Sequence, residues 1–391
     1  MANVLLISYD YPPILSPESI QVQRRAIMMA NLGHNVFVLT SHLNPYFEFL
    51  DNTLLMTHPK IKIFRTKKPL VEKLLHIFFK YFNIGDRKLW WKEFAYTIAL
   101  RIIKDYKIDL LYTDSVPFVN HFVGLKLKAQ MPELKWIAHF SDPWSLNPYL
   151  KYRFKWQYKL NKKFETKILK LCDIVCVVSN KMKELFLNEY GFLENKIKVV
   201  PHVYDEKLYK TNKKQPQNQK IKVVHTGNIY GLRSIRYLLE ALKEIRHQNI
   251  EFHFYGKIKK EEKSLVEKWN LNAFVKIFLQ VTYLESLKIM TNADFLLVVD
   301  APIKNSPFFP SKLVDYIGAK KPIIALTPNN STTAEVLREL NMSQFIASPD
   351  DKEDIKKLLC KIIEGISFKV NDKIKKYYMN NVSFIRDIIH I

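Results

Sequence analysis

Charged and hydroxyl side chains gather over residues 306–325, where a Pro-broken loop runs into a short helical segment and then a buried strand. Lys312 stands at the loop-to-helix junction, and Asp315 follows one turn later. At such a junction the free backbone N–H groups and the helix dipole attract anions. Lys312 would add a point charge for a phosphate, and Asp315 would accept hydrogen bonds from ribose hydroxyls. The segment therefore predicts a nucleotide site, with Ser311 among its contacts and a helix over Leu313–Ala319.

A glycine-flanked loop earlier in the same half of the chain offers a second set of ligand contacts. Gly227 and Gly231 enclose three residues, including Asn228, and let the backbone approach a ligand closely. Arg233 could form a forked pair of hydrogen bonds with a diphosphate. The alternative is an ordinary strand-to-helix turn with a surface arginine. Together with Lys312, the loop favours nucleotide binding.

Two further candidates for chemistry lie in the stretch Trp136–Trp144. His139 ends a predicted strand and could hydrogen-bond a sugar hydroxyl or stabilise charge at a reacting carbon; a hydrogen-bonded structural histidine is the alternative. Asp142, directly before Pro143, would either cap the following turn or bind an acceptor. The sequence shows no metal-ligand spacing, no Ser-His-Asp set and no carboxylate pair typical of glycoside hydrolysis.

The stretch from Lys151 to Lys170 is strongly basic, with eight basic residues and one acidic residue. Lys155 and Lys159 belong to a stripe of lysines spaced four apart, and Trp156 belongs to a parallel aromatic and apolar stripe. This pattern is typical of a helix that lies on an anionic membrane surface. The alternative is a domain helix that packs Trp156 on a sheet and leaves its lysines in solvent.

The elements that must position these residues alternate along the chain. Strands separated by helix-length segments predict parallel sheets built from βαβ units. The chain of 391 residues is long enough for two domains. The predicted strands are Val4–Ser8, Val36–Thr40, Ile61–Phe64, Leu110–Thr113, Trp136–His139, Ile174–Val178, Lys198–Pro201, Ile221–His225, Glu251–Tyr255, Val275–Phe278, Phe295–Val299, Pro322–Leu326 and Gln344–Ala347.

We therefore predict an α/β protein of two doubly wound, Rossmann-like domains. The N-terminal domain would span residues 1–205, a polar linker 206–220, and the C-terminal domain 221–370. Residues 371–391 would form a C-terminal helix that returns to the N-terminal domain. Ligand sites should lie beyond the carboxyl ends of the strands and face an interdomain cleft.

Composition narrows the partners and the compartment. A formal net charge of +23 favours an anionic partner, although a lysine-rich composition alone would also explain it. No helix-turn-helix, zinc or RNP-like motif is present, so nucleic acid is not predicted. The N-terminus lacks a signal peptide and no window approaches ~20 apolar residues. We expect a cytoplasmic protein, peripheral on the inner face of the cell membrane.

The motifs and their order resemble the family 4 glycosyltransferases of the GT-B fold. The family pattern P-x-K-x-x-E-Y, followed by P-[VI]-[IV]-A, is similar to Pro310–Tyr316 and Pro322–Ala325. The family usually carries two glutamates eight positions apart; Asp315 replaces the second and Pro307 the first. Further similar segments, spread over essentially the whole chain, are Tyr9–Pro13, Gly33–Val36, Asp173–Ser179, Pro201–Asp205 and His225–Arg233.

The resemblance implies a retaining, metal-independent hexosyltransferase that needs no cofactor. The enzyme would move a sugar from a nucleotide diphosphate sugar to a bacterial cell-surface polysaccharide, such as lipopolysaccharide or capsule, or to a lipid-linked acceptor. Arg233 and Lys312 would hold the diphosphate, Asp315 the ribose, and His139 the donor sugar or the transition state. The alternatives are a GT-B-like nucleotide-sugar isomerase, motivated by Pro307, and a non-catalytic protein that binds nucleotide sugars or membranes.

Overall fold

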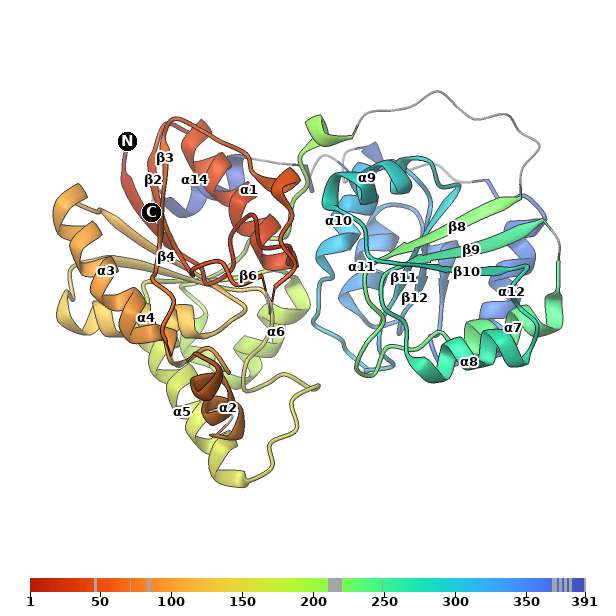
Figure 1. Cartoon of the computed structure of the whole chain (residues 1–391), viewed down its shortest axis with the longest axis horizontal. Coiled ribbons are helices and arrows are strands. Elements are labelled where there is room, and N and C mark those ends of the chain that lie inside the picture. Colours follow the sequence, from red (N-terminus) through yellow and green to blue (C-terminus); the bar gives the residue numbers. More distant parts are fainter. Residues whose placement is uncertain are drawn as a thin grey trace. The chain divides into compact units, whose positions relative to one another are not determined.

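The computed structural model describes residues 1–45, 48–70, 72–82, 86–209, 220–247, 249–367, 371–372, 375, 378–379 and 382–389. The chain forms two compact units (Figure 1). The first contains Met1–His202, Pro307–Phe309 and Asn380–Ile391, and the second contains Val203–Ser306 and Pro310–Met379. Most of the predicted linker, residues 210–219, lies outside the described residues, as does part of the predicted C-terminal helix.

The first unit is built on a parallel sheet of seven strands, counted among the described residues. Its order is β3-β2-β1-β4-β5-β6-β7. Strands β2 and β3 are therefore added on one side of β1, and β4 to β7 on the other. The central strands are nearly continuous buried apolar runs, as expected where helices cover both faces of a sheet. The strands are β1 (Asn3–Ile7), β2 (Asn35–Thr40), β3 (Ile61–Arg65), β4 (Leu110–Ser115), β5 (Lys135–Phe140), β6 (Ile174–Val177) and β7 (Ile197–Val199).

Helices in two groups pack on this sheet. In one group α3 contacts α4 and α4 contacts α5; in the other, α14 from the C-terminal end packs against α1 (Figure 1). The helices are α1 (Pro17–Asn31), α2 (Glu72–Phe82), α3 (Trp91–Tyr106), α4 (Val119–Gln130), α5 (Lys155–Leu171), α6 (Asn180–Glu189) and α14 (Val382–Ile389). Single 3-10 turns occur at Asn52–Leu54 and Gly191–Leu193.

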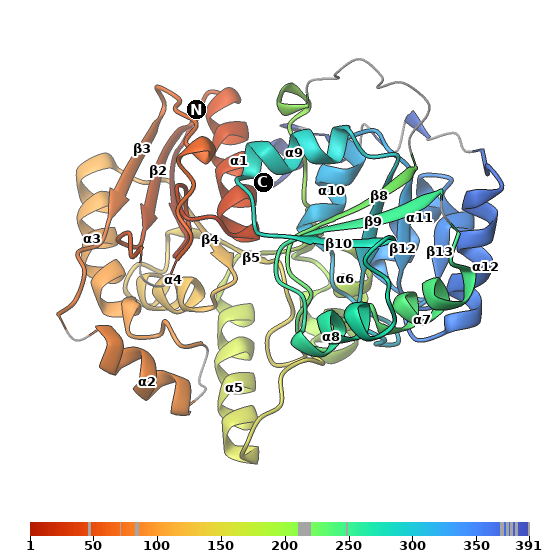
Figure 2. The same cartoon turned by 45° about the vertical axis from the view of Figure 1, so that its right-hand side comes forward.

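The second unit repeats the architecture with a six-stranded parallel sheet in the part of the chain described here. Its order is β10-β9-β8-β11-β12-β13, and the turned view of Figure 2 shows β9 between β8 and β10. The strands are β8 (Ile221–Thr226), β9 (Ile250–Tyr255), β10 (Val275–Phe278), β11 (Phe295–Val299), β12 (Ile323–Leu326) and β13 (Ile346–Ala347). The helices are α7 (Arg236–Ile245), α8 (Lys260–Lys268), α9 (Tyr283–Thr291), α10 (Ser311–Gly318), α11 (Thr332–Glu339) and α12 (Lys352–Ile363), with 3-10 turns at Glu206–Leu208 and Ser343–Phe345.

The predicted fold class is confirmed, since both sheets are parallel and doubly wound. In each sheet the first strand lies between its two neighbours at the point where the strand order reverses: β1 between β2 and β4, and β8 between β9 and β11. Open parallel sheets bind ligands at such a switch point, outside the carboxyl ends of the strands. The carboxyl ends of β1 and β4 and of β8 and β11 are therefore the places to look for chemistry.

Candidate functional site

At the switch point of the second unit, a glycine brings the backbone against a lysine. Gly227 directly follows β8 and has φ +103°, a conformation that side chains rarely adopt. A Cβ atom at this position would lie 2.9 Å from Nζ of Lys312. The side chain of Asn228 accepts a hydrogen bond from the backbone N–H of Lys257 (2.8 Å), which ties the loop to the segment after β9. Two sequence-predicted segments, the glycine loop and the start of α10, thus meet.

Lys312 is held by a histidine that the sequence reasoning did not select. Nδ1 of the buried His225 lies 2.8 Å from the carbonyl oxygen of Leu297 and donates to it, so Nε2 carries the lone pair. The Lys312 ammonium lies 3.2 Å from that Nε2 atom and donates to it. Burial, and then the charge of Arg233, lower the pKa of Lys312 to about 7. An anion bound nearby would raise the pKa of Lys312 again and so favour its charged form.

Arg233 adds a second cation to this loop. Its guanidinium lies 5.0 Å from the ring centroid of Tyr230, within the range of a cation–π interaction. Its effect on the pKa of Lys312 shows that the two basic groups are close enough to repel each other. Two such cations beside a glycine backbone form an arrangement suited to a phosphate-bearing ligand.

Helix α10, which carries Lys312, is fastened at several points. The hydroxyl of Tyr316 accepts the N–H of Thr226 at 3.0 Å, which joins α10 to the end of β8. Asp315, 6% exposed, accepts hydrogen bonds on Oδ1 from the hydroxyls of Tyr209 (2.7 Å) and Tyr283 (3.0 Å). Ser311 is the first residue of the helix and is half-buried. The predicted ribose contact, Asp315, is thus already shared with two protein hydroxyls.

At the first unit's switch point the structure places His139 within the sheet. Strand β5 runs one residue further than predicted, because Ser115 and Phe140 still pair in register. The His139 side chain is fully buried, and its Nδ1 lies 2.5 Å from the hydroxyl of Tyr112. Burial, followed by the nearby Arg25, keeps the pKa of His139 well below its ordinary value, so the ring is neutral. Asp142, in the loop after β5, is half-buried.

Two family models match consecutive halves of the chain. The model for Glycosyltransferase Family 4 matches residues 20–208, and the model for Glycosyl transferases group 1 matches residues 206–378. The chain belongs to the family 4 glycosyltransferases.

Solved structures agree with this assignment at the level of the fold. A glycosyltransferase from Rickettsia africae matches with a TM-score of 0.66 at 16% identity, over 99% of this chain and 97% of that one. HepE of Anabaena, solved in complex with UDP and glucose, gives 0.66 at 13% identity, with 100% and 99% covered. WaaG, a glycosyltransferase involved in lipopolysaccharide biosynthesis, gives 0.61 at 15%, with 98% and 94% covered. The glycosyltransferase therefore has the GT-B fold. No curated protein sequence matches it.

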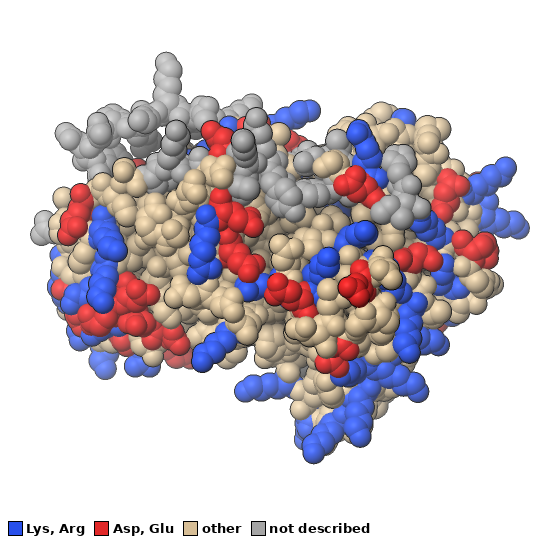
Figure 3. Space-filling view, turned by 180° about the vertical axis from the view of Figure 1, so that it is seen from behind, with Lys and Arg blue, Asp and Glu red and all other residues tan. Residues whose placement is uncertain are grey.

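The basic segment of the glycosyltransferase forms α5, but the helix begins later than the lysine stripe. Gln157 accepts the N–H of Phe154 (3.1 Å) with its side chain and so caps the helix start, which leaves Lys151 in the preceding loop. Lys155 and Lys159 are exposed, and Trp156 is 45% exposed instead of packed on the sheet. Figure 3 shows Lys and Arg side chains gathered around the end of α5. The alternative in which Trp156 packs on the sheet is therefore wrong.

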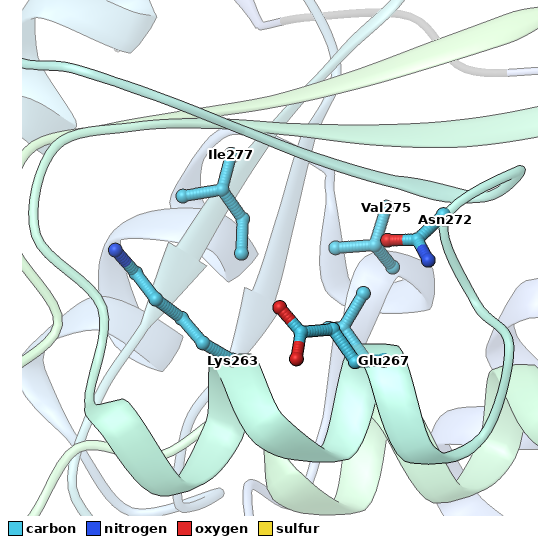
Figure 4. A pocket seen from close by; sticks show the side chains of 6 residues that line it. Lys263, Glu267, Asn272, Val275 and Ile277 are labelled. Carbon is cyan, nitrogen blue, oxygen red and sulfur yellow. The ribbon is translucent and has the colours of Figure 1, made fainter.

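A surface hollow of about 280 Å³ lies elsewhere in the second unit, between α8 and the edge strand β10 (Figure 4). Lys263 and Glu267 of α8 line it together with Val275 and Ile277 of β10. The hollow extends along β10 from its first residue, Val275, to Ile277, and none of its lining residues belongs to the candidate site. It plays no part in the candidate site.

Neither metal ligands nor a spanning helix are found in the described part of the chain. Within those residues, no group of three or more His, Cys, Asp or Glu side chains could hold a metal ion. No helix formed by the described residues is long and apolar enough to cross a membrane. Metal independence and membrane contact remain predictions.

The close approach of Gly227 to Lys312 gives a direct test of the loop. In Gly227→Ala the new Cβ would meet the Lys312 ammonium, so we expect UDP or GDP, whichever the protein binds, to lose about tenfold or more in affinity, ~1.4 kcal/mol by calorimetry. Gly365→Ala is the matched control, because Gly365 lies outside the loop and has a similar positive φ (+93°), but its Cβ would meet nothing within 4 Å. Equal losses in both variants, or none in Gly227→Ala, would refute the contact's role.

Proposed function

We propose that this glycosyltransferase takes its sugar from a nucleotide diphosphate sugar bound by the second unit. The observation that carries the proposal is the Lys312 ammonium, held by His225 against the Gly227 backbone and accompanied by Arg233. HepE, which has the same fold, was solved with UDP in one structure and with UDP and glucose in another. In this scheme Lys312, Arg233, Asn228 and Gly227 bind the diphosphate.

The remaining parts of the proposed donor site are Ser311 and Asp315. Ser311 would offer its hydroxyl and backbone at the start of α10, where the helix dipole favours negative charge. Asp315 would accept ribose hydroxyls. Because the basic side chains would balance the diphosphate charge, no metal is required. Transfer with retention, in which the leaving diphosphate helps to deprotonate the acceptor, fits a site without a dedicated protein base.

The acceptor would be a cell-surface polysaccharide or a lipid-linked glycan, reached at an anionic membrane surface. Two neighbouring helices of the first unit support this. The exposed residues Leu74, Ile77, Phe78 and Tyr81 follow the i, i+3, i+4, i+7 spacing along α2 and so form one apolar face. The Gln157 side chain of α5 donates to the Phe82 carbonyl at the end of α2 (2.9 Å), which joins that face to the basic end of α5. Apolar and basic surface side by side suit an anionic bilayer.

Calorimetric titration with UDP, GDP and their common sugar conjugates, with and without EDTA, tests the donor proposal. We expect one nucleotide to bind selectively and with the same affinity in EDTA. Failure of every nucleotide to bind would contradict the proposal and favour a non-catalytic membrane-binding protein. A GT-B-like isomerase would instead convert the bound nucleotide sugar with no acceptor present, which chromatography of the nucleotide sugars would detect.

The low pKa of Lys312 predicts proton uptake when the donor binds. At pH 8 the amine, with a pKa of about 7, is mostly neutral, whereas a bound diphosphate favours the ammonium. A nucleotide sugar is the ligand of choice, since its diester phosphates do not titrate in this range. Titrations in buffers of different ionisation enthalpy should show uptake at pH 8, little uptake at pH 6, and affinity that falls as the pH rises.

Variants at the lysine complete this test. Lys312→Met should abolish the uptake, and Lys312→Ala should weaken binding by about 1.5–3 kcal/mol, the range for a hydrogen bond to a charged group. Lys268→Ala, which removes the same charge at the last residue of α8, toward the amino ends of the strands, is the control. Unchanged affinity in Lys312→Ala would remove Lys312 from the donor site.

The membrane proposal predicts binding to vesicles that contain anionic lipid and weak binding to neutral ones. Lys155→Glu with Lys159→Glu should abolish sedimentation with anionic vesicles at low salt, and Trp156→Ala or Phe78→Ala should reduce it severalfold. Lys243→Glu with Lys268→Glu, a matched change of charge in the second unit, should leave it intact. Loss of binding in both double variants would indicate only a general effect of net charge.

A further inference from the structure

Asp300 is a buried acid at the switch point of the second unit, directly after β11. Its backbone N–H donates to the carbonyl oxygen of Leu326, so β11 and β12 are still paired at this point. The residue is only 5% exposed. The negative charge of Asp300 raises the pKa of Lys312, so the carboxylate lies near the ammonium of the proposed diphosphate site. Asp300 and Lys312 both belong to the second unit.

One oxygen of the Asp300 carboxylate is held by the protein. Asp300 and Thr327 continue the register that pairs Val299 with Leu326, so their side chains lie on the same face of the sheet. The Thr327 hydroxyl donates to Oδ2 of Asp300 at 2.8 Å. The same Thr327 oxygen lies 2.7 Å from the hydroxyl of Ser331, whose side chain caps α11. These two hydroxyls fix the orientation of the carboxylate.

The other oxygen, Oδ1, accepts no hydrogen bond from the described residues. Asp300 also forms no ion pair with Lys312 or with any other basic side chain in that part of the chain. Buried polar atoms are usually hydrogen-bonded, because leaving one without a partner costs free energy. A carboxylate oxygen of this kind beside a proposed ligand site therefore marks a contact for the ligand.

The charge of Asp300 decides which part of the ligand fits. A phosphate would be repelled by the carboxylate, whereas a neutral hydroxyl would donate to it in a charge-assisted hydrogen bond. In a nucleotide sugar, the groups next to the diphosphate are the ribose and the donor sugar, and both carry neutral hydroxyls. Asp315 is the proposed contact of the ribose, so the donor sugar is the group left for Asp300.

We propose that Asp300 is a specificity-determining residue, whose Oδ1 atom accepts a hydrogen bond from a hydroxyl of the donor sugar. Thr327 is a positioning residue that orients the carboxylate. The proposal rests on the proposed function, because it assigns a contact to the sugar of the nucleotide diphosphate donor. A site built to bind a hydroxyl rejects an analogue that lacks it, since a buried polar group then stays unpaired.

The test measures how much the sugar adds to the affinity of the nucleotide. Calorimetry of the full-length protein compares UDP-glucose, UDP-galactose, UDP-N-acetylglucosamine and GDP-mannose with the methyl esters of UDP and GDP. The methyl esters carry the same diester charge but no sugar. The titrations are made at pH 6, where Lys312, with a pKa of about 7, is mostly protonated.

Two variants and a matched control separate the charge of Asp300 from its structural contact. Asp300→Asn keeps an acceptor for the Thr327 hydroxyl but removes the charge. Thr327→Val keeps the charge but removes the donor. Asp294→Asn is the control, because the exposed Asp294 precedes the same strand at its amino end and also accepts one protein hydrogen bond, from the N–H of Lys222 (2.8 Å).

We expect Asp300→Asn to reduce the affinity gained from the sugar about tenfold or more, as for a hydrogen bond to a charged group. Its affinity for the methyl ester should change much less, because the ester makes no contact with Oδ1. Thr327→Val should reduce the gain by a smaller factor. Asp294→Asn should leave the gain unchanged, and the melting temperatures should remain similar.

Several results would overturn the proposal. Equal weakening of the ester and the sugar conjugates in Asp300→Asn would mean that Asp300 only tunes Lys312. An equal loss in Thr327→Val would assign the effect to the hydroxyls instead of the carboxylate. Removal of the gain by EDTA would make Asp300 a metal ligand, and wild-type conjugates that bind no tighter than the esters would leave no sugar contact. Failure of the wild type to bind every nucleotide would instead contradict the proposed function.

Discussion

The hydrogen bond between Lys312 and His225 positions the cation of the second unit's site, and the sheet itself fixes its geometry. His225 belongs to β8, and its Nδ1 hydrogen bond goes to Leu297 on the neighbouring β11. The pairing of two strands at the switch point therefore turns the Nε2 lone pair toward α10. Because the imidazole is buried and neutral, it holds the amine in place without neutralising it by an opposite charge. The amine stays available to an anion.

The two units use the same topology but place different charged groups at the carboxyl ends of their strands. In the second unit Lys312 and Arg233 repel each other and would gain from a diphosphate. In the first unit the Arg25 guanidinium forms an ion pair with Asp114, and burial raises the pKa of the nearby Glu18 carboxyl well above its ordinary value. Coulomb interactions are strong in partly buried positions. The pair of cations in the second unit therefore favours an anionic ligand, whereas the guanidinium of the first unit is already paired.

Much of this fold could be predicted from the sequence, because strands buried on both faces are read as continuous apolar runs. Gly227 and Lys312 could also be predicted, because a glycine in a tight loop and a lysine at a loop-to-helix junction can be recognised from the neighbouring residues alone. His225 could not, because inside a strand it reads as one more buried residue. The hydrogen bond between Glu18 and Ser141 could not be predicted either, because 123 residues separate them and no local pattern encodes the contact. The start of α5 could not be predicted from the lysine spacing, because the cap formed by the Gln157 side chain determines it.

Asp315 shows how one side chain can connect binding to rigidity. As the shorter carboxylate, it remains close to its helix, where the hydroxyls of Tyr209 and Tyr283 converge on one of its oxygens. Tyr209 also packs on Gly318, where a Cβ would lie 2.6 Å from its ring. The hydrogen bond between Tyr316 and Thr226 adds a further attachment next to Asp315. These contacts together fix α10 one turn after Lys312. Because α10 is fixed in this way, the Lys312 ammonium loses little freedom when an anion binds. More of the electrostatic attraction then appears as affinity.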